Sequence, residues 1–279
     1  MKFGVIAPNF NIPKKIVEFA RVAEESGFDH FLLSDHYWFE EEPDFLDSWT
    51  MLAYLAGETS TLRLGTCVTP ITFRPPLQFA KIVTTLDNAS EGRIIVGVGA
   101  GWAEPEFRMF STWHPYKERY AQFLEALELL TESWTQKSVT FSGKFYNVQD
   151  SIVEPKPVQK PYPPMLFGGW SNNRIVRLAG QKGDGWTPTG PRSGEAVKTP
   201  ADYRRFVLEI EKGRNAAHCV SKEFAYGCRF GPLDDPREYI REVESYRAAG
   251  LTCYQLGVNV RKDSVEVLRE FGDAVIATS

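Results

Sequence analysis

The sequence predicts an α/β protein with the architecture of a (β/α)8 TIM barrel. Eight short apolar or β-branched runs occur along the 279 residues, and each is followed by a stretch with helical periodicity. The first four runs start about 30 residues apart, which is the length of one strand–helix–strand unit. The chain length also suits such a barrel, which needs about 250 residues. The runs are FGVIAP (3–8), HFLLSDH (30–36), LRLGTCVTP (62–70), RIIVGVGAG (93–101), PMLFGGW (164–170), GWTPTG (185–190), FAYGCRF (224–230) and CYQLGVNV (253–260).

Helix signals fill the segments between these runs. A first helix carries apolar residues at helical spacing from Ile16 and stops at Gly27, a glycine placed as a C-terminal cap. A helix over 75–89 begins with two prolines, which the first helical turn tolerates. We expect the remaining helices at about 48–59, 116–134, 172–180, 201–215, 236–249 and 264–277.

The regular spacing breaks between the fourth and fifth runs. Residues 136–162 contain an alternating stretch, VTFSGKFYNV, with a hairpin turn expected at Ser142-Gly143. The following prolines cannot be helical. We interpret 136–162 as an insertion docked on the barrel, so that residues 1–279 form one domain. A second irregular segment, 187–200, has the length typical of a lid or a binding loop.

Composition excludes several classes of function. A formal net charge of −4 argues against a general attraction to nucleic acid or to an anionic membrane. The four cysteines form no CxxC pair, and the histidines lack zinc-ligand spacing. The chain enters a strand directly, without a signal segment, and no apolar run approaches the roughly 20 residues of a membrane span. We therefore expect a cytoplasmic soluble protein that acts on a small molecule.

Barrels of this kind build their active sites at the carboxyl ends of the strands. The second run closes with Ser34-Asp35-His36, and Tyr37 and Trp38 follow. A histidine exchanges a proton close to neutral pH, so His36 is a candidate for proton transfer. Asp35 is placed to orient the imidazole or to accept a polar edge of a ligand. The alternative is that His36 only closes the strand through local hydrogen bonds.

Two further strand ends lack large side chains. The fourth run closes with GVGAGW (97–102), where so little side chain lets a flat ligand approach the backbone. The dinucleotide-binding fingerprint of a Rossmann fold, GxGxxG, needs a third glycine that is absent here, and no paired acidic residue follows. We therefore reject a dinucleotide-binding Rossmann turn. The fifth run passes through Gly168 and Gly169 into a helix, which makes either an anion site or a tight βα turn.

Together these strand ends resemble the bacterial luciferase-like family of flavin- and deazaflavin-dependent oxidoreductases, and the match covers nearly the whole chain. Five motifs in this order and at this spacing are specific. The compact length and the GVGAGW motif are most similar to the branch that uses coenzyme F420, an 8-hydroxy-5-deazaflavin. The motifs are SDH (34–36), TSTLRLGTCVTPITFRPP (59–76), LDNASEGRIIVGVGAGWAEPEF (86–107), PPMLFGGW (163–170) and GDGWTP (183–188).

The resemblance implies that the barrel mouth holds a tricyclic cofactor ring. It implies a non-prolyl cis peptide at Cys67-Val68, in a bulge behind the ring, and a cofactor phosphate at Gly168 and Gly169. The cofactor-binding residues implied in this way are Asp35, Cys67, Val68, Thr69, Gly99, Ala100, Gly101, Phe167, Gly168, Gly169 and Trp170.

One departure from the family is informative. Sugar-phosphate dehydrogenases of this family carry an acid after the glycines of the fourth strand, where this chain has Trp102. The role of that acid, and glucose 6-phosphate as substrate, therefore cannot be carried over. Together with Tyr37, Trp38 and Trp170, Trp102 indicates an apolar, flat-walled substrate pocket.

The sequence thus predicts an F420-dependent oxidoreductase that transfers a hydride between C5 of the deazaflavin and a small carbonyl, alcohol or activated alkene. His36 would exchange the proton, and Asp35 would place either the imidazole or the hydroxyl edge of the cofactor. Basic residues in strand-end loops would meet the acidic cofactor tail: Arg74, Arg192 and Lys198.

Other functions stay open at this point. The first is an FMN-dependent monooxygenase supplied by a separate reductase, and the second is a barrel that binds flavin without catalysis. A metal hydrolase built on Asp35, His36 and His114 is a third, although no ligand spacing supports it. Because dimers are usual in the family, we expect a homodimer by analogy.

Overall fold

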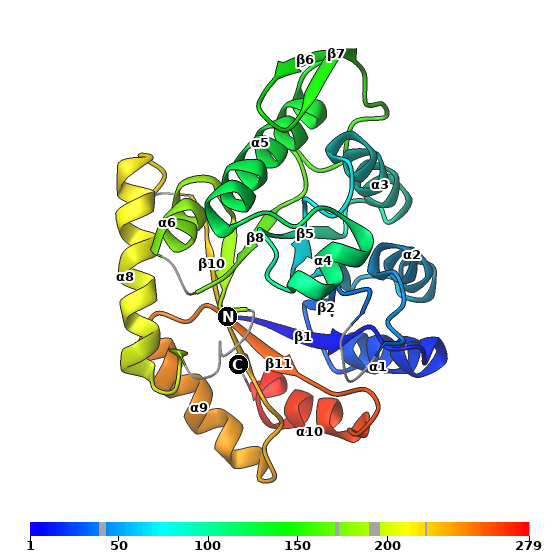
Figure 1. Ribbon diagram of the computed structural model, residues 1–279. Coiled ribbons are helices and arrows are strands. Elements are labelled where there is room, and N and C mark those ends of the chain that lie inside the picture. Colours follow the sequence, from blue (N-terminus) through cyan, green and yellow to red (C-terminus); the bar gives the residue numbers. More distant parts are fainter. Residues whose placement is uncertain (39–42, 171–172, 190–195, 221, 279) are drawn as a thin grey trace.

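The computed structural model describes residues 1–38, 43–170, 173–189, 196–220 and 222–278. They form a closed barrel of eight parallel strands surrounded by helices (Figure 1), which confirms the predicted fold class. The strands are β1 (Lys2–Pro8), β2 (His30–Ser34), β3 (Arg63–Thr66), β4 (Thr69–Pro70), β5 (Ile94–Gly99), β8 (Met165–Gly168), β9 (Gly185–Thr187), β10 (Ala225–Phe230) and β11 (Cys253–Gly257).

The barrel closes because its third strand is split in two. Hydrogen bonding follows the order β3-β2-β1-β11-β10-β9-β8-β5-β4, and β3 also pairs with β5, with Leu64 opposite Ile94. The second half, β4, pairs with the carboxyl-terminal end of β5, where Thr69 lies opposite Val98. Residues 67 and 68 interrupt the strand, so this break lies at the barrel mouth.

Helices cover the outside of the barrel, as the periodicity predicts. Proline starts α1 and α3, where its missing N–H costs nothing. Helix α4 was not expected. The predicted helix over 172–180 is described only from Asn173, because Asn172 lies outside the described residues. The helices are α1 (Pro13–Glu25), α2 (Ser48–Glu58), α3 (Pro76–Ala89), α4 (Glu104–Phe110), α5 (Tyr116–Thr135), α6 (Asn173–Lys182), α8 (Pro200–Ala216), α9 (Pro236–Ala248), α10 (Glu266–Ala274) and the 3-10 turn η1 (Ile276–Thr278).

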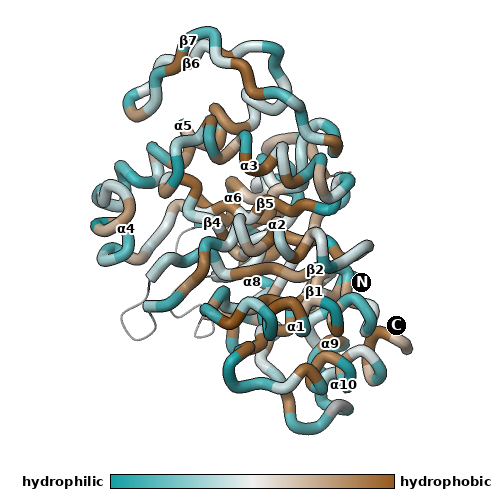
Figure 2. The backbone as a smooth tube through the Cα atoms, turned by 90° about the vertical axis from the view of Figure 1, so that its right-hand side faces the viewer, coloured by the Kyte–Doolittle hydropathy of each residue, from teal (hydrophilic) through white to brown (hydrophobic). Residues whose placement is uncertain are grey.

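Side chains of the strands alternate between the helices and the barrel interior. On β1, Val5 and Ala7 belong to the large core under the helices, where Figure 2 shows apolar segments in the middle of the molecule. Ile6 points the other way, into a small apolar cluster inside the barrel. Because that cluster has only four buried members, glycines and polar side chains occupy much of the interior. The members are Ile6, Leu32, Cys67 and Leu166.

The segment 136–162 contains the expected hairpin. Strands β6 (Val139–Ser142) and β7 (Asn147–Ser151) are antiparallel, with Ser142 opposite Asn147. The carboxylate of Glu125 on α5 accepts the N–H groups of Lys144 at 2.9 Å and Phe145 at 2.8 Å. These bonds dock the hairpin on α5, at the edge of the molecule (Figures 1 and 2). The assignment of the whole chain to one domain stays a prediction.

Within the described part of the chain, no helix has both the length and the apolar character needed to cross a membrane.

We expect opposite effects from adding one methyl group at two glycines. A Cβ at Gly97 would overlap the carbonyl oxygen of Thr66 on the neighbouring strand. Gly97→Ala should therefore lower the free energy of unfolding by about 1–3 kcal/mol. Gly57, near the end of α2, has open space around it, and Gly57→Ala should raise that free energy by up to about 1 kcal/mol. Urea denaturation of both variants measures the difference; equal stabilities would contradict the close strand packing.

Candidate active site

The carboxyl ends of the strands enclose a cavity of about 520 Å³. Most of the residues singled out from the sequence line it, although they come from four different strand ends. Aromatic side chains of α5, Tyr116 and Tyr120, add to the wall. The predicted residues found in the lining are His36, Cys67, Val68, Gly99, Ala100, Gly101, Trp102, Gly168, Gly169 and Trp170.

The interruption of the third strand contains the expected cis peptide. The bond between Cys67 and Val68 is a non-prolyl cis bond, which confirms this prediction. A Cβ on Gly99 would lie 2.8 Å from Val68 Cγ2, and one on Gly168 would lie 2.6 Å from the same atom. The two glycines therefore first make room for Val68 itself, and the ligand surface that results is backbone and the Val68 side chain.

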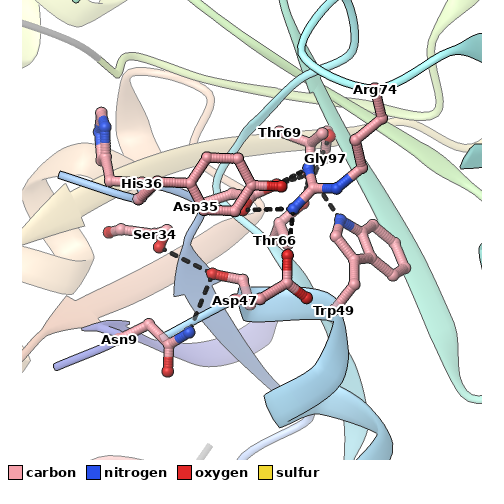
Figure 3. Close-up of polar contacts among 12 residues, drawn as sticks. Asn9, Ser34, Asp35, His36, Asp47, Trp49, Thr66, Thr69, Arg74 and Gly97 are labelled. Atoms are coloured by element: carbon pink, nitrogen blue, oxygen red, sulfur yellow. Dashed lines mark hydrogen bonds and ion pairs between the residues drawn. The ribbon is translucent and has the colours of Figure 1, made fainter. Parts of the chain in front are cut away.

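A buried polar network lies behind this bulge (Figure 3). The Thr69 hydroxyl donates to Asp35 Oδ2 at 2.7 Å and accepts from Trp49 Nε1 at 2.9 Å. Arg74 binds both oxygens of Asp35, at 2.8 and 3.2 Å, and Asp47 Oδ2 at 2.7 Å. Asp35 is only 1% exposed. The network thus lies inside the wall of the cavity and does not line it.

This network corrects three expectations. The Asp35 carboxylate is bound to Arg74 and Thr69, and Figure 3 shows the His36 ring pointing away from it, so Asp35 does not orient the imidazole. Asp35 and Thr69 support the cavity wall rather than line it. Arg74 is committed to two carboxylates and is not available to a cofactor tail.

Electrostatics explain why a buried guanidinium is stable here. Burial alone would lower the pKa of Arg74, but the charges and hydrogen bonds of Asp35 and Asp47 raise it above its ordinary value. Burial alone would raise the pKa of Asp47, yet hydrogen bonds from Arg74 and from the Thr50 N–H lower it. Arg74 and Asp47 therefore stay charged in this pair.

The partner of His36 is Glu106, on α4. His36 Nδ1 lies 2.9 Å from Glu106 Oε2, and the glutamate is 1% exposed. Glu106 Oε1 accepts the backbone N–H of Tyr37 at 2.5 Å and that of Trp38 at 3.3 Å. One buried carboxylate thus holds both the imidazole and the loop after β2. Glu106 belongs to the motif at 86–107, but the sequence alone does not bring it to His36, because that contact depends on how α4 packs.

Several predicted wall residues lie elsewhere. Tyr37 stacks on Phe73 with ring centres 5.6 Å apart and does not line the cavity. Trp38 is likewise absent from the lining, and Phe167 is fully buried. Trp102 does line the cavity, with its ring edge-on to the His36 imidazole at 5.7 Å.

Gly101 lines the cavity but serves the protein backbone first. Its φ of +76° lies in the left-handed region, and a Cβ there would overlap the ring of Phe107. A larger residue at this position would therefore disturb the turn into α4 whether or not a ligand is bound. The absence of a side chain at Gly101 is thus required by the protein itself and is not by itself a sign of a bound ring.

The expected basic residues do not line the cavity. Arg192 lies outside the described residues, and Lys198 is exposed and not part of the lining. The cavity instead contains Arg229 of β10, which sequence reasoning missed. Its position next to the end of the run FAYGCRF was the available signal.

The residues of the metal-hydrolase alternative are engaged separately. Asp35 binds Arg74, His36 binds Glu106, and His114 Nδ1 lies 3.4 Å from Glu118 Oε2. Among the residues that the structure describes, no group of three or more His, Cys, Asp or Glu side chains could hold a metal ion.

Known proteins share this architecture. An F420-dependent glucose-6-phosphate dehydrogenase of Amycolatopsis mediterranei is 32% identical over 209 residues, which cover 74% of this chain and 60% of that protein. An FMNH(2)-dependent dimethylsulfone monooxygenase of Pseudomonas putida is 32% identical over 185 residues, covering 66% and 50%. The chain thus spans between half and three fifths of the length of these curated relatives.

A solved structure extends the likeness to the whole chain. It is described as an F420-dependent secondary alcohol dehydrogenase in complex with an F420-acetone adduct. It covers 100% of this chain and 99% of its own, with a TM-score of 0.85 and 21% identity, a level that speaks for the fold alone.

A family model also matches this chain. The model described as luciferase-like monooxygenase matches residues 1–267. That range contains every strand end that forms the cavity. The resemblance drawn from the five motifs is therefore confirmed, and the chain belongs to the luciferase-like monooxygenase family.

Proposed function

We propose that this chain is an F420-dependent oxidoreductase that moves a hydride between the deazaflavin and a small organic substrate. The substrate would be a carbonyl compound, an alcohol or an activated alkene. The observation that carries this proposal is the His36–Glu106 pair, at 2.9 Å, in the wall of the cavity that the Cys67-Val68 bulge also lines. A proton-transferring group and a flat ligand surface thus share one space.

The strand ends suit a flat, phosphate-bearing cofactor. Backbone at Gly99 and Ala100 and the Val68 side chain form a surface on which a tricyclic ring would rest. The turn at Gly168 and Gly169 leads into α6, so we place the cofactor phosphate there. When bound, the deazaflavin supplies a carbon that accepts or donates a hydride.

The protein supplies the proton and its placement. Because Nδ1 of His36 is bonded to Glu106, we assign Nε2 to proton exchange with the substrate oxygen. Glu106 is itself held by two backbone N–H groups, which limits its movement and thereby that of the ring. The side chain of His36 is 19% exposed, as a group that meets a ligand must be. The Trp102 ring lies edge-on beside it, with ring centres 5.7 Å apart.

The relatives support the cofactor assignment in part. Those named as F420-dependent glucose-6-phosphate dehydrogenases favour F420, whereas the FMNH(2)-dependent monooxygenase favours a second candidate, an FMN-dependent monooxygenase. We prefer the first because the strand-end motif GVGAGW is most similar to the F420 branch. Trp102 stands where the sugar-phosphate dehydrogenases carry their acid, so we do not propose their substrate. The expected homodimer stays a prediction.

Equilibrium binding of the two cofactors decides between these candidates. F420 should bind at least about tenfold more tightly than FMN, a difference of roughly 1.4 kcal/mol. Fluorescence titration of the purified protein with each cofactor measures both dissociation constants. Micromolar binding of FMN together with undetectable binding of F420 would overturn the proposal in favour of the monooxygenase.

Substitution of His36 should affect turnover more than cofactor binding. General acid–base catalysis contributes about 10²–10⁴-fold, so His36→Ala should lower kcat by that factor and change the cofactor Kd by less than about tenfold. Steady-state kinetics with F420 and a panel of alcohols and ketones measure these effects. Retained turnover with lost cofactor binding would make His36 a binding residue.

Glu106 acts through His36, so its substitution has a different signature. Glu106→Gln keeps the size of the side chain but turns a negative acceptor into a neutral amide next to Nδ1. We expect kcat to fall less than in His36→Ala and the pH optimum to shift, with cofactor affinity retained. The exposed His218 lies outside the cavity lining, and His218→Asn serves as the control without effect. An unchanged pH profile in Glu106→Gln would contradict the positioning role.

A further inference from the structure

Arg229 points into the barrel. On β10 it alternates with Cys228 and Phe230, which are buried in the core under the helices. Its register partner on β11 is Gln255, whose side-chain oxygen accepts from Thr187 within the barrel at 2.7 Å. The side chain of Arg229 therefore rises from the interior into the cavity that His36 also lines.

Gly257, on the neighbouring strand β11, leaves space for the Arg229 side chain. A Cβ at Gly257 would overlap Arg229 Nε and would lie 3.0 Å from both Cγ and Cζ. The stem and the guanidinium thus lie flat along β11. Any residue larger than glycine at this position would displace them. The missing side chain of Gly257 thus leaves the space that the Arg229 guanidinium occupies at the cavity.

The charge of Arg229 has no partner in the described structure. Among the described residues, its guanidinium takes part in no hydrogen bond and no ion pair, whereas Arg74 binds two carboxylates. The described lining of the cavity includes no aspartate or glutamate. Arg229 is also the permanent positive charge of that lining, in a chain whose net charge is −4.

The positive charge of Arg229 also acts on the bulge at Cys67-Val68. Burial raises the pKa of the Cys67 thiol to about 12, and the positive charge of Arg229 acts against that rise. Cys67 belongs to the cis peptide on which we place the cofactor ring. The guanidinium and the expected ring site are therefore close enough to interact.

We propose that Arg229 binds the carboxylate of the substrate, so that the substrate is a small organic acid with a carbonyl or alcohol group. This inference rests on the proposed function. A guanidinium offers two parallel N–H donors that match the two oxygens of a carboxylate. One such charge balances a carboxylate, whereas a phosphate dianion would leave a charge unmatched. The cavity must also hold the ring, which favours a small molecule.

The reaction then leaves the acidic group unchanged. In the reducing direction, the bound deazaflavin would supply a hydride, with its two electrons, to the carbonyl carbon, and His36 would give one proton to the carbonyl oxygen. The product is the hydroxy acid, with the cofactor oxidised. Arg229 orients the substrate so that its reacting carbon lies over the ring and its oxygen lies toward His36.

Binding of 2-oxobutyrate and of its methyl ester to the F420-loaded protein tests the proposal. The ester replaces the charged carboxylate by a neutral group that is larger by one methyl, and tryptophan fluorescence is a suitable signal because Trp102 and Trp170 line the cavity. The acid should bind at least about tenfold more tightly than the ester. Arg229→Met should abolish this preference, and Arg229→Lys should retain part of it because the charge remains.

A matched control separates a specific contact from a general loss of charge. Lys117 is exposed on α5, beside Tyr116 of the cavity wall, but does not line the cavity. Lys117→Met should keep the preference of the wild type. Equal binding of acid and ester by the wild type, or no measurable binding of the acid, would overturn the proposal. So would an Arg229→Met variant that still prefers the acid.

Two further arms separate other anions from the substrate carboxylate. If Arg229→Met weakens binding of F420 itself by tenfold or more, the anion belongs to the cofactor and the substrate assignment is wrong. If glucose 6-phosphate binds more tightly than 2-oxobutyrate in an Arg229-dependent manner, the site is one for phosphate and the proposal is overturned. Should the wild type bind FMN and not F420, the proposed function fails at that step, and the same titrations on the FMN-loaded protein still test Arg229.

Discussion

The guanidinium of Arg74 is the contact on which the barrel mouth depends. It joins Asp35 at the end of β2 to Asp47, whose other oxygen accepts the Thr50 N–H and so caps α2. Through Asp35 it also reaches Thr69, the first residue after the bulge. Removing one partner of a buried ion pair leaves an uncompensated charge and costs about 3–5 kcal/mol. A strand end, a helix start and the bulge are therefore held together by one charge cluster.

Asp35 and His36, which follow β2, have different roles in the structure. Asp35 enters the buried network, while His36 projects toward the cavity. The chain turns here just beyond the strand, where the His36 N–H donates to the Ser34 carbonyl at 3.2 Å. The support that Asp35 does not give to the imidazole comes from Glu106 on α4. The same glutamate binds the loop after β2, so the proton-exchanging group and the wall near Trp102 are positioned together.

The two arginines at the mouth show how environment separates structure from recognition. Arg74 is 10% exposed and surrounded by carboxylates, so its binding capacity is used within the protein. Arg229 packs against Gly257 at the cavity and contacts no carboxylate among the described residues. The first stabilises the site, and the second is available to a ligand of opposite charge.

Local sequence was enough to predict the eight barrel strands, most helices and the 139–148 hairpin, because hydrophobic periodicity and turn residues act over short distances. The resemblance of five motifs added the family and the cis peptide at Cys67-Val68. Only the tertiary structure decided which carboxylate meets His36, since Glu106 lies 70 residues away and reaches it through the packing of an unpredicted helix. The same holds for the arginines: residue type shows that each is charged, but whether a carboxylate lies within reach depends on how distant strand ends meet in space.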